Sequence, residues 1–134
     1  MASDSLDANI ILRLIEGDNP AQRKKAIKFL EQPGPVHHIG DLALSESIYV
    51  LESVYGYTRE QAIDRINFFL THYSSVIRYS RHLTSYVFPF YLAHPKLSFN
   101  DCCLAFYAHE HQAEPLYTFD QKLAQQSPYA KELK

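Results

Sequence analysis

The sequence predicts an α/β fold in which a central, mostly parallel sheet lies between two layers of helices. Short apolar segments near residues 3–7, 36–39, 75–79 and 115–118 have the length of buried strands. Each of them precedes a longer segment with apolar residues at helical spacing, and this alternation is typical of a parallel sheet. The 134 residues contain no repeat and no linker, so a single three-layer α/β/α domain is expected over residues 1–134.

Capping residues support the helices of the first half. Asn19 can cap a helix, and Pro20 suits the first turn because proline lacks the N–H that would stay unpaired there. The Pro-Gly-Pro sequence at 33–35 ends this helix. Three apolar residues are expected on its inner face: Ala26, Phe29 and Leu30.

Two more helices are expected before residue 75. One runs from Asp41 to a stop near Gly56, and Thr58 with Gln61 forms the capping box that starts the next. The apolar residues of the first are Leu44, Ile48, Leu51 and Tyr55. The second is expected to bury Ile63, Ile66 and Leu70, with Phe69 alongside.

Proline and serine mark the helices of the second half. A helix from about Arg81 is expected to kink or end early at Pro89. Its apolar residues are Leu83, Val87 and Tyr91. Ser98 caps a further helix, and a C-terminal helix is expected from Phe119 onward.

Composition limits the classes of function. The chain is 46% hydrophobic and 21% charged, as globular proteins are. A net charge of -2 argues against a broad basic surface for nucleic acid, whereas a small carboxylate site does not require a positive net charge.

The adjacent Cys102 and Cys103 make a poor disulfide, so reduced thiols in a cytoplasmic protein are expected. No segment has the pattern of a signal peptide or the length of a membrane helix.

Four acidic residues lie where a parallel sheet places its ligand site, beyond the carboxyl ends of the strands. Asp7 and Asp120 follow the first and last predicted strands. Asp101 lies in the first turn of the helix capped by Ser98, and Glu46 lies in the first or second turn of an earlier helix. We expect these residues, distant in the sequence, to converge at one edge of the sheet.

Each acid also has a structural interpretation. Asp101 lies three residues after Ser98, where a carboxylate stabilises a helix start. Asp7 and Asp120 could be turn residues at strand ends, and Glu46 could be a solvated helix residue. No acid is convincing by itself.

The four acids lie, in order, in the segments LDANIILRL at 6–14, LSESIYVL at 44–51, SFNDCCLA at 98–105 and LYTFDQKL at 116–123. In their order and spacing these segments resemble the PIN-domain family, and within it the VapC-like toxin ribonucleases. The resemblance extends roughly from Ser5 to Ala124. The family often has an acid where this chain has Ser98, and Pro89 interrupts a helix that usually runs smoothly.

This resemblance implies an endoribonuclease that uses Mg²⁺ or Mn²⁺. Its catalytic and metal-binding residues would be Asp7, Glu46, Asp101 and Asp120. Supporting polar residues would be Asn9, Ser45 and Thr118. Family members are commonly homodimers, held inactive by a small antitoxin whose C-terminal segment lies across the site. The rival hypothesis is a non-catalytic PIN-like module that binds a protein or RNA.

The expected chemistry follows from four carboxylates that repel one another. A hard divalent cation resolves the repulsion, because Mg²⁺ and Mn²⁺ prefer oxygen ligands. Our hypothesis makes Asp7 and Asp101 the direct ligands. Glu46 and Asp120 would bind through water, hold a second ion or position the attacking water. Ser45 has no His-Asp partnership that would make it a nucleophile.

Other side chains have a functional and a structural interpretation. The cations that could contact the RNA backbone are Arg13, Arg78, Arg81 and the cluster Arg23, Lys24, Lys25 and Lys28, although outer helix faces are usually just solvated. The aromatic side chains that could stack on bases, but are more often core or interface residues, are Tyr49, Tyr55, Tyr57 and Tyr73. Structural or surface roles, rather than zinc binding, are expected for His37, His38, His109 and His111.

Overall fold

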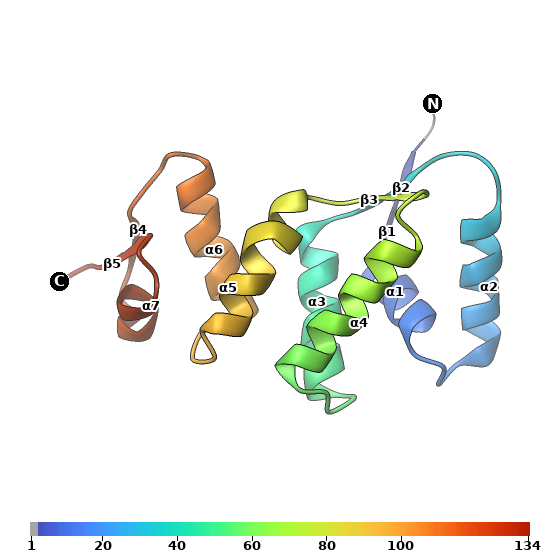
Figure 1. The fold of residues 1–134 in the computed structure, drawn as a ribbon, viewed down its shortest axis with the longest axis horizontal. Coiled ribbons are helices and arrows are strands. Elements are labelled where there is room, and N and C mark those ends of the chain that lie inside the picture. The colour runs from blue at the N-terminus through green and yellow to red at the C-terminus, as the bar shows by residue number, and fades with distance from the viewer. Residues whose placement is uncertain (1–2) are drawn as a thin grey trace. The chain divides into compact units, whose positions relative to one another are not determined.

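The computed structural model describes residues 3–134, which form two compact units with a boundary between Ser80 and Arg81. In the first unit the elements are β1 (Asp4–Leu6), α1 (Ala8–Ile15), α2 (Pro20–Glu31), β2 (His37–Ile39), α3 (Asp41–Ser53), α4 (Arg59–His72) and β3 (Ile77–Arg78) (Figure 1). In the second they are the π-helical turn η1 (Leu83–Val87), α5 (Phe88–Ala93), α6 (Phe99–Glu110), β4 (Leu116–Thr118), α7 (Gln121–Gln126) and β5 (Ala130–Glu132). None of the described helices has both the length and the apolar character needed to cross a membrane.

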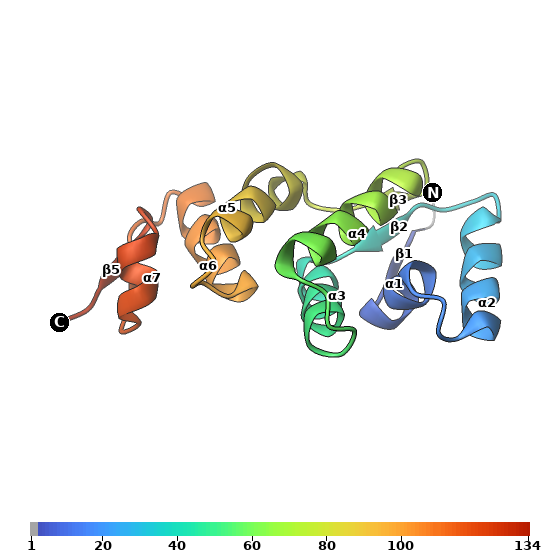
Figure 2. The ribbon, with the colours of Figure 1, turned by 60° about the horizontal axis from the view of Figure 1, so that its bottom comes forward.

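The first unit contains a parallel sheet with the strand order β1-β2-β3 (Figure 2). Each strand buries one apolar side chain: Leu6, Ile39 and Ile77. Leu6 pairs with Ile39, so β1 and β2 end at the same level. The helices that follow these two strands, α1 and α3, therefore start from the same edge of the sheet.

Helical spacing identified most of the core of this unit. Helix α1 packs against α2, α3 and α4. The side chains at this centre that are essentially inaccessible to solvent include Ile11, Leu44, Ile48, Leu51, Ile63, Ile66 and Leu70. The expected inner faces of α3 and α4 are thus confirmed, although α3 ends at Ser53 and Tyr55, two residues beyond it, is only half-buried.

The inner face of α2 is narrower than expected. Ala26 and Leu30, four residues apart, are buried, but Phe29 is 42% exposed. The assignment of Phe29 to the core was wrong, because one residue moves a side chain about 100° around a helix. The ring of Phe29 lies at the edge of the face, 4.9 Å from the ring of His37.

The expected helix starts of this unit are present. The side chain of Asn19 accepts a hydrogen bond from the backbone N–H of Gln22 at 3.2 Å. Thr58 and Gln61 form both hydrogen bonds of the capping box, at 2.9 and 3.1 Å. Gly56 has φ +74°, a conformation that glycine adopts without strain.

The second unit contains one parallel pair of strands, β4 and β5, in which Leu116 pairs with Ala130. The four expected strands are therefore all present, and every strand pairing among residues 3–134 is parallel. Strand β5 was not expected, because Ala130-Lys131-Glu132 lacks the apolar character of a strand. The C-terminal helix is short and ends at Gln126.

Pro89 changes the helix that contains it, as expected. The residues before it form η1, and α5 begins at Phe88 with Pro89 in its first turn. Because η1 runs directly into α5, Pro89 lies inside a continuous helical segment, where its missing N–H removes a hydrogen bond to the preceding turn. The apolar residues expected in this segment are buried: Leu83, Val87 and Tyr91.

Candidate functional site

Asp7 lies directly after β1 and caps α1. One carboxylate oxygen, Oδ1, accepts a hydrogen bond from the backbone N–H of Ile10 at 3.2 Å. The other oxygen accepts none within residues 3–134, and the side chain is exposed. The cap therefore orients the carboxylate and leaves one oxygen for another partner.

A groove of about 760 Å³ opens beside this carboxylate. Its walls come from β1, α1 and α2, and its lining residues are Ser5, Asp7, Asn9, Ile10, Arg13, Gln22, Lys25, Ala26 and Phe29. Acidic, amide, cationic and aromatic groups thus share one open cavity. This mixture suits a polar ligand that also has an aromatic part.

Glu46 lies in the second turn of α3 and is exposed. Its carboxylate makes no hydrogen bond or ion pair with the described residues. Leu42 and Tyr49, four residues before it and three after it, lie on the same helix face and are 77% and 71% exposed. Of the two structural roles expected for Tyr49, core or interface, its exposure contradicts the core role, and the interface role stays a prediction. Ser45, beside Glu46, is half-buried.

Asp101 and Ser98 form a capping box at the start of α6. The hydroxyl oxygen of Ser98 accepts from the Asp101 N–H at 3.0 Å, and Asp101 Oδ2 accepts from the Ser98 N–H at 3.1 Å. The structural interpretation of Asp101 is thus confirmed. It does not exclude a functional one, because Oδ1 has no hydrogen bond within residues 3–134.

Asp120 follows β4 and caps α7. Its Oδ1 accepts hydrogen bonds from the backbone N–H groups of Lys122 and Leu123, at 2.9 and 3.3 Å. The hydroxyl oxygen of Thr118 accepts from the Asp120 N–H at 2.9 Å. Thr118 therefore fixes the backbone that carries this carboxylate.

The four candidate acids divide equally between the two units. Asp7 and Glu46 belong to the first, and Asp101 and Asp120 belong to the second. Among residues 3–134, no three His, Cys, Asp or Glu side chains form a group that could hold a metal ion. The convergence of all four acids stays a prediction.

The donor chemistry of these acids nevertheless fits a hard cation. Asp7, Asp101 and Asp120 each use one oxygen for a helix cap, and the other oxygen of each accepts no hydrogen bond from the described part of the chain. Single carboxylate oxygens held in a fixed orientation are ligands that Mg²⁺ and Mn²⁺ accept.

The candidate RNA-binding cations differ in how strongly neighbours hold them. Arg13 donates to Gln22 at 2.8 Å and pairs with Asp18 at 3.3 Å. Arg78 donates to the carbonyl of Ile77 at 2.8 Å. Arg81 is exposed.

The basic cluster of α2 faces more than one cavity. Lys25 lines the groove beside Asp7. Lys24 and Lys28 line a separate groove, together with Arg23. Only part of the cluster is therefore placed to act beside the carboxylate.

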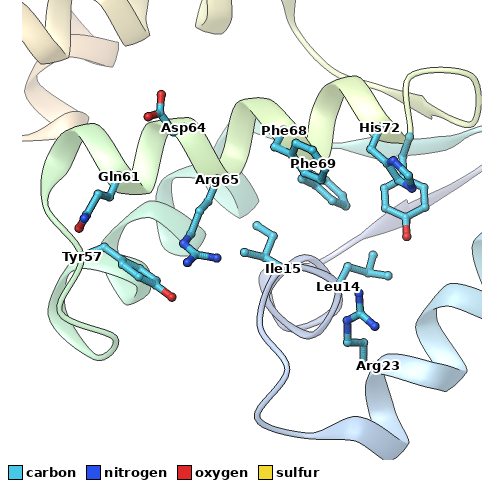
Figure 3. Close-up of a pocket in the computed structure, with 11 residues that line it drawn as sticks. Leu14, Ile15, Arg23, Tyr57, Gln61, Asp64, Arg65, Phe68, Phe69 and His72 are labelled. Atoms are coloured by element: carbon cyan, nitrogen blue, oxygen red, sulfur yellow. The ribbon is translucent and has the colours of Figure 1, made fainter.

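A second pocket, of about 520 Å³, lies between α1 and α4 (Figure 3). Phe68 is 73% exposed there, and its ring stacks on His72 with centroids 5.8 Å apart. The guanidinium carbon of Arg65 lies 4.2 Å from the centre of the Tyr57 ring. This pocket was not anticipated, although Phe68 and Phe69 are adjacent on one helix and cannot both face the core.

Two of the tyrosines expected in the core or an interface hold hydrogen bonds near that pocket. The hydroxyl of Tyr55 donates to Asp18 at 2.7 Å, and this bond raises the pKa of Tyr55. The hydroxyl of Tyr57 donates to Glu16 at 3.0 Å. Burial and that bond raise the pKa of Tyr57, and burial raises the pKa of Tyr73.

Histidines in both units have structural contacts. His37 is buried and pairs with Asp4 across β1 and β2. His109 pairs with Glu114 and stacks on Tyr129 with centroids 4.2 Å apart.

Comparison with known proteins identifies the family. Residues 5–127 match the PIN domain, nearly the whole chain. No curated protein matches the sequence. PIN domains are typically nucleases and generally use divalent metal ions. The alternation of strands and helices, the parallel pairing and the match over residues 5–127 agree, and the chain belongs to the PIN-domain family.

Proposed function

We propose that this protein is a metal-dependent endoribonuclease whose site comprises Asp7, Glu46, Asp101 and Asp120. The observation that carries the proposal is the position of Asp7. Asp7 directly follows a parallel strand and lines an open groove with Lys25, and one of its carboxylate oxygens has no hydrogen bond to any described residue. A nuclease of the PIN family needs a carboxylate with an available oxygen next to a site that can hold a phosphate of the substrate.

We also propose that residues 1–134 act as one domain. Asp7 and Asp120 follow parallel strands, Asp101 lies in the first turn of α6, and Glu46 lies one turn into α3. In one parallel sheet, strand ends and the helices that follow them meet at a common edge. Joining the two units in that way would bring the four acids together.

In the assembled site, Asp7 and Asp101 would be direct metal ligands, each through the oxygen that its cap leaves available. A bound Mg²⁺ or Mn²⁺ supplies a water of lowered pKa and stabilises negative charge on the scissile phosphate. Glu46 would accept the proton of the attacking water or hold that water in line. Asp120 would hold a second ion or an ordered water, with its backbone fixed by Thr118. Asn9, which lines the groove, and Ser45, beside Glu46, would support the site through polar contacts.

The VapC-like order of the four acid motifs supports a narrower proposal. The protein would be the toxin of a type II toxin–antitoxin pair, acting on RNA in the cytoplasm as a homodimer. A small antitoxin would silence it by laying its C-terminal segment across the carboxylates. RNA would be guided by cations such as Arg13, Arg78 and Arg81.

One observation favours a second candidate, a non-catalytic PIN-like module. Asp7, Asp101 and Asp120 all stabilise helix starts, so folding alone accounts for these three carboxylates. Calorimetry with Mn²⁺ separates the candidates. Binding that releases protons and vanishes in Asp7→Asn favours the enzyme, whereas no binding at millimolar Mn²⁺ favours the module.

The experiment for the enzyme is an incubation with total RNA, with Mg²⁺ or Mn²⁺ and with a chelator. Asp7→Asn and Asp101→Asn are the informative variants, because asparagine caps a helix about as well as aspartate but carries no charge. Discrete cleavage that needs metal and is absent from both variants is expected. Cleavage that persists in both variants would contradict the proposed site.

A further inference from the structure

Two side chains of α2, Lys25 and Phe29, line the groove that also contains the candidate acid Asp7. Lys25 and Phe29 lie four residues apart, so they occupy the same face of the helix. Both line the groove that contains Asp7 and Asn9. One cavity of about 760 Å³ therefore combines a carboxylate, an ammonium group and an aromatic ring.

Phe29 is exposed at a place where its ring is firmly supported. The ring is 42% exposed, and its centre lies 4.9 Å from that of His37. His37 is itself buried and paired with Asp4. An aromatic side chain with a fixed support and an open approach is suited to stacking on a nucleobase.

Of the two cations that line this groove, Arg13 and Lys25, Lys25 is the one without a partner among the described residues. Its ammonium group makes no ion pair or hydrogen bond with residues 3–134. Arg13, which lines the same groove, is held by Asp18 and Gln22. A phosphate that enters the groove would thus meet Lys25 without breaking an existing ion pair.

We propose that the groove binds one unpaired nucleotide of single-stranded RNA, with its phosphate at Lys25 and its base on Phe29. This inference rests on the proposed function and adds to it the two side chains, Lys25 and Phe29, that hold a nucleotide of the substrate beside Asp7. A base in a duplex is covered on both faces by its neighbours and cannot stack on Phe29. The nucleotide so held would lie beside Asp7, which lines the same groove.

Binding without cleavage is the direct test. A fluorescein-labelled uridine 12-mer, and the same strand paired with its complement, are titrated with Asp7→Asn protein in Mg²⁺ and followed by anisotropy. The added substitutions are Phe29→Leu, Phe29→Tyr, Lys25→Gln and Lys24→Gln. Lys24→Gln is the matched control because Lys24 lines a different groove. Thermal unfolding of each variant checks that it is folded.

We expect the single strand to bind more tightly than the duplex. Phe29→Leu should weaken binding about tenfold or more, as loss of one stacked base does, and Phe29→Tyr should restore it. Affinity for RNA falls as the salt concentration rises. In a plot of log affinity against log salt concentration, Lys25→Gln should make this slope shallower by about 0.7, the value for one phosphate contact to a single strand. Lys24→Gln should leave that slope unchanged.

Three results would overturn the inference. These are equal binding of duplex and single strand, unchanged affinity in Phe29→Leu, and a Lys25→Gln effect no larger than that of Lys24→Gln. RNA cleavage by the unsubstituted protein in the same buffer would then show that the proposed function stands without this subsite. If neither binding nor cleavage occurs, both the subsite and the proposed function fail.

Discussion

Ser98 and Asp101 cap each other at the start of α6, each accepting a hydrogen bond from the other's backbone N–H at 3.1 Å or less. The same carboxylate is a candidate metal ligand. A substitution that removes it would therefore affect folding and chemistry together. Separating the two effects requires variants that change one and preserve the other.

The two roles of this carboxylate predict opposite outcomes for two variants. Ser98→Ala removes the hydroxyl cap and should lower the free energy of unfolding by about 1 kcal/mol, with RNA cleavage retained at temperatures where the protein is folded. Asp101→Asn should change stability less and abolish cleavage. Urea unfolding and a cleavage assay on the same samples measure both. Full cleavage by folded Asp101→Asn would remove Asp101 from the chemistry.

Metal binding should stabilise the folded chain. Because the unfolded chain has no assembled carboxylate site, Mn²⁺ should raise the melting temperature in a concentration-dependent way. Asp7→Asn should lose this rise while keeping its melting temperature in a chelator, since asparagine preserves the cap. Differential scanning calorimetry measures both quantities. An equal rise in Asp7→Asn would place the metal elsewhere.

The hydrogen bond from Tyr55 to Asp18 should make stability depend on alkaline pH. The bond raises the pKa of Tyr55 above 10.0, so the folded state keeps a proton that the unfolded state loses. Stability from this bond is then present below pH 10 and falls as pH rises through the raised pKa. Tyr55→Phe should cost about 1 kcal/mol at pH 8 and less above pH 10.

Urea unfolding at several pH values tests this dependence. Tyr86→Phe is the control, because the Tyr86 side chain is 59% exposed and its hydroxyl makes no hydrogen bond with residues 3–134, while the ring contact with Phe106 is kept. A cost of Tyr55→Phe that stays constant from pH 8 to pH 11 would contradict the assignment.

The single-domain proposal predicts one unfolding transition. Leu44 in α3 and Leu83 in η1 are both fully buried, one in each unit. Leu44→Ala and Leu83→Ala should each lower the same transition by about 2–5 kcal/mol, as large-to-small core substitutions do. Two transitions, with each variant shifting only one of them, would show two independent domains.

Elements with strong local signals were predictable from the sequence. The alternation of short strand segments with amphipathic helices located β1 to β4, and side-chain caps at Asn19, Thr58 and Ser98 located three helix starts. Strand β5 lacks such a signal, because its alanine, lysine and glutamate resemble a surface loop. Its pairing with β4 is a tertiary contact that residue type does not encode.

The candidate site was predictable in its residues but not in its surroundings. Motif order located Asp7 at the end of β1, whereas the groove beside it depends on how α2 packs. Helical periodicity placed Phe29 in the core, yet its ring lies at the edge of the buried face.

Glu46 offers the most direct test of the nuclease proposal, because its carboxylate makes no hydrogen bond or ion pair with residues 3–134. Glu46→Gln should therefore leave the free energy of unfolding unchanged, within about 0.5 kcal/mol. The decisive measurement is Mn²⁺-dependent RNA cleavage by this variant beside the unsubstituted protein and Glu52→Gln, a substitution six residues further along α3. The proposal predicts that only Glu46→Gln loses cleavage while its fold is intact. Cleavage by Glu46→Gln at the unsubstituted rate would contradict it.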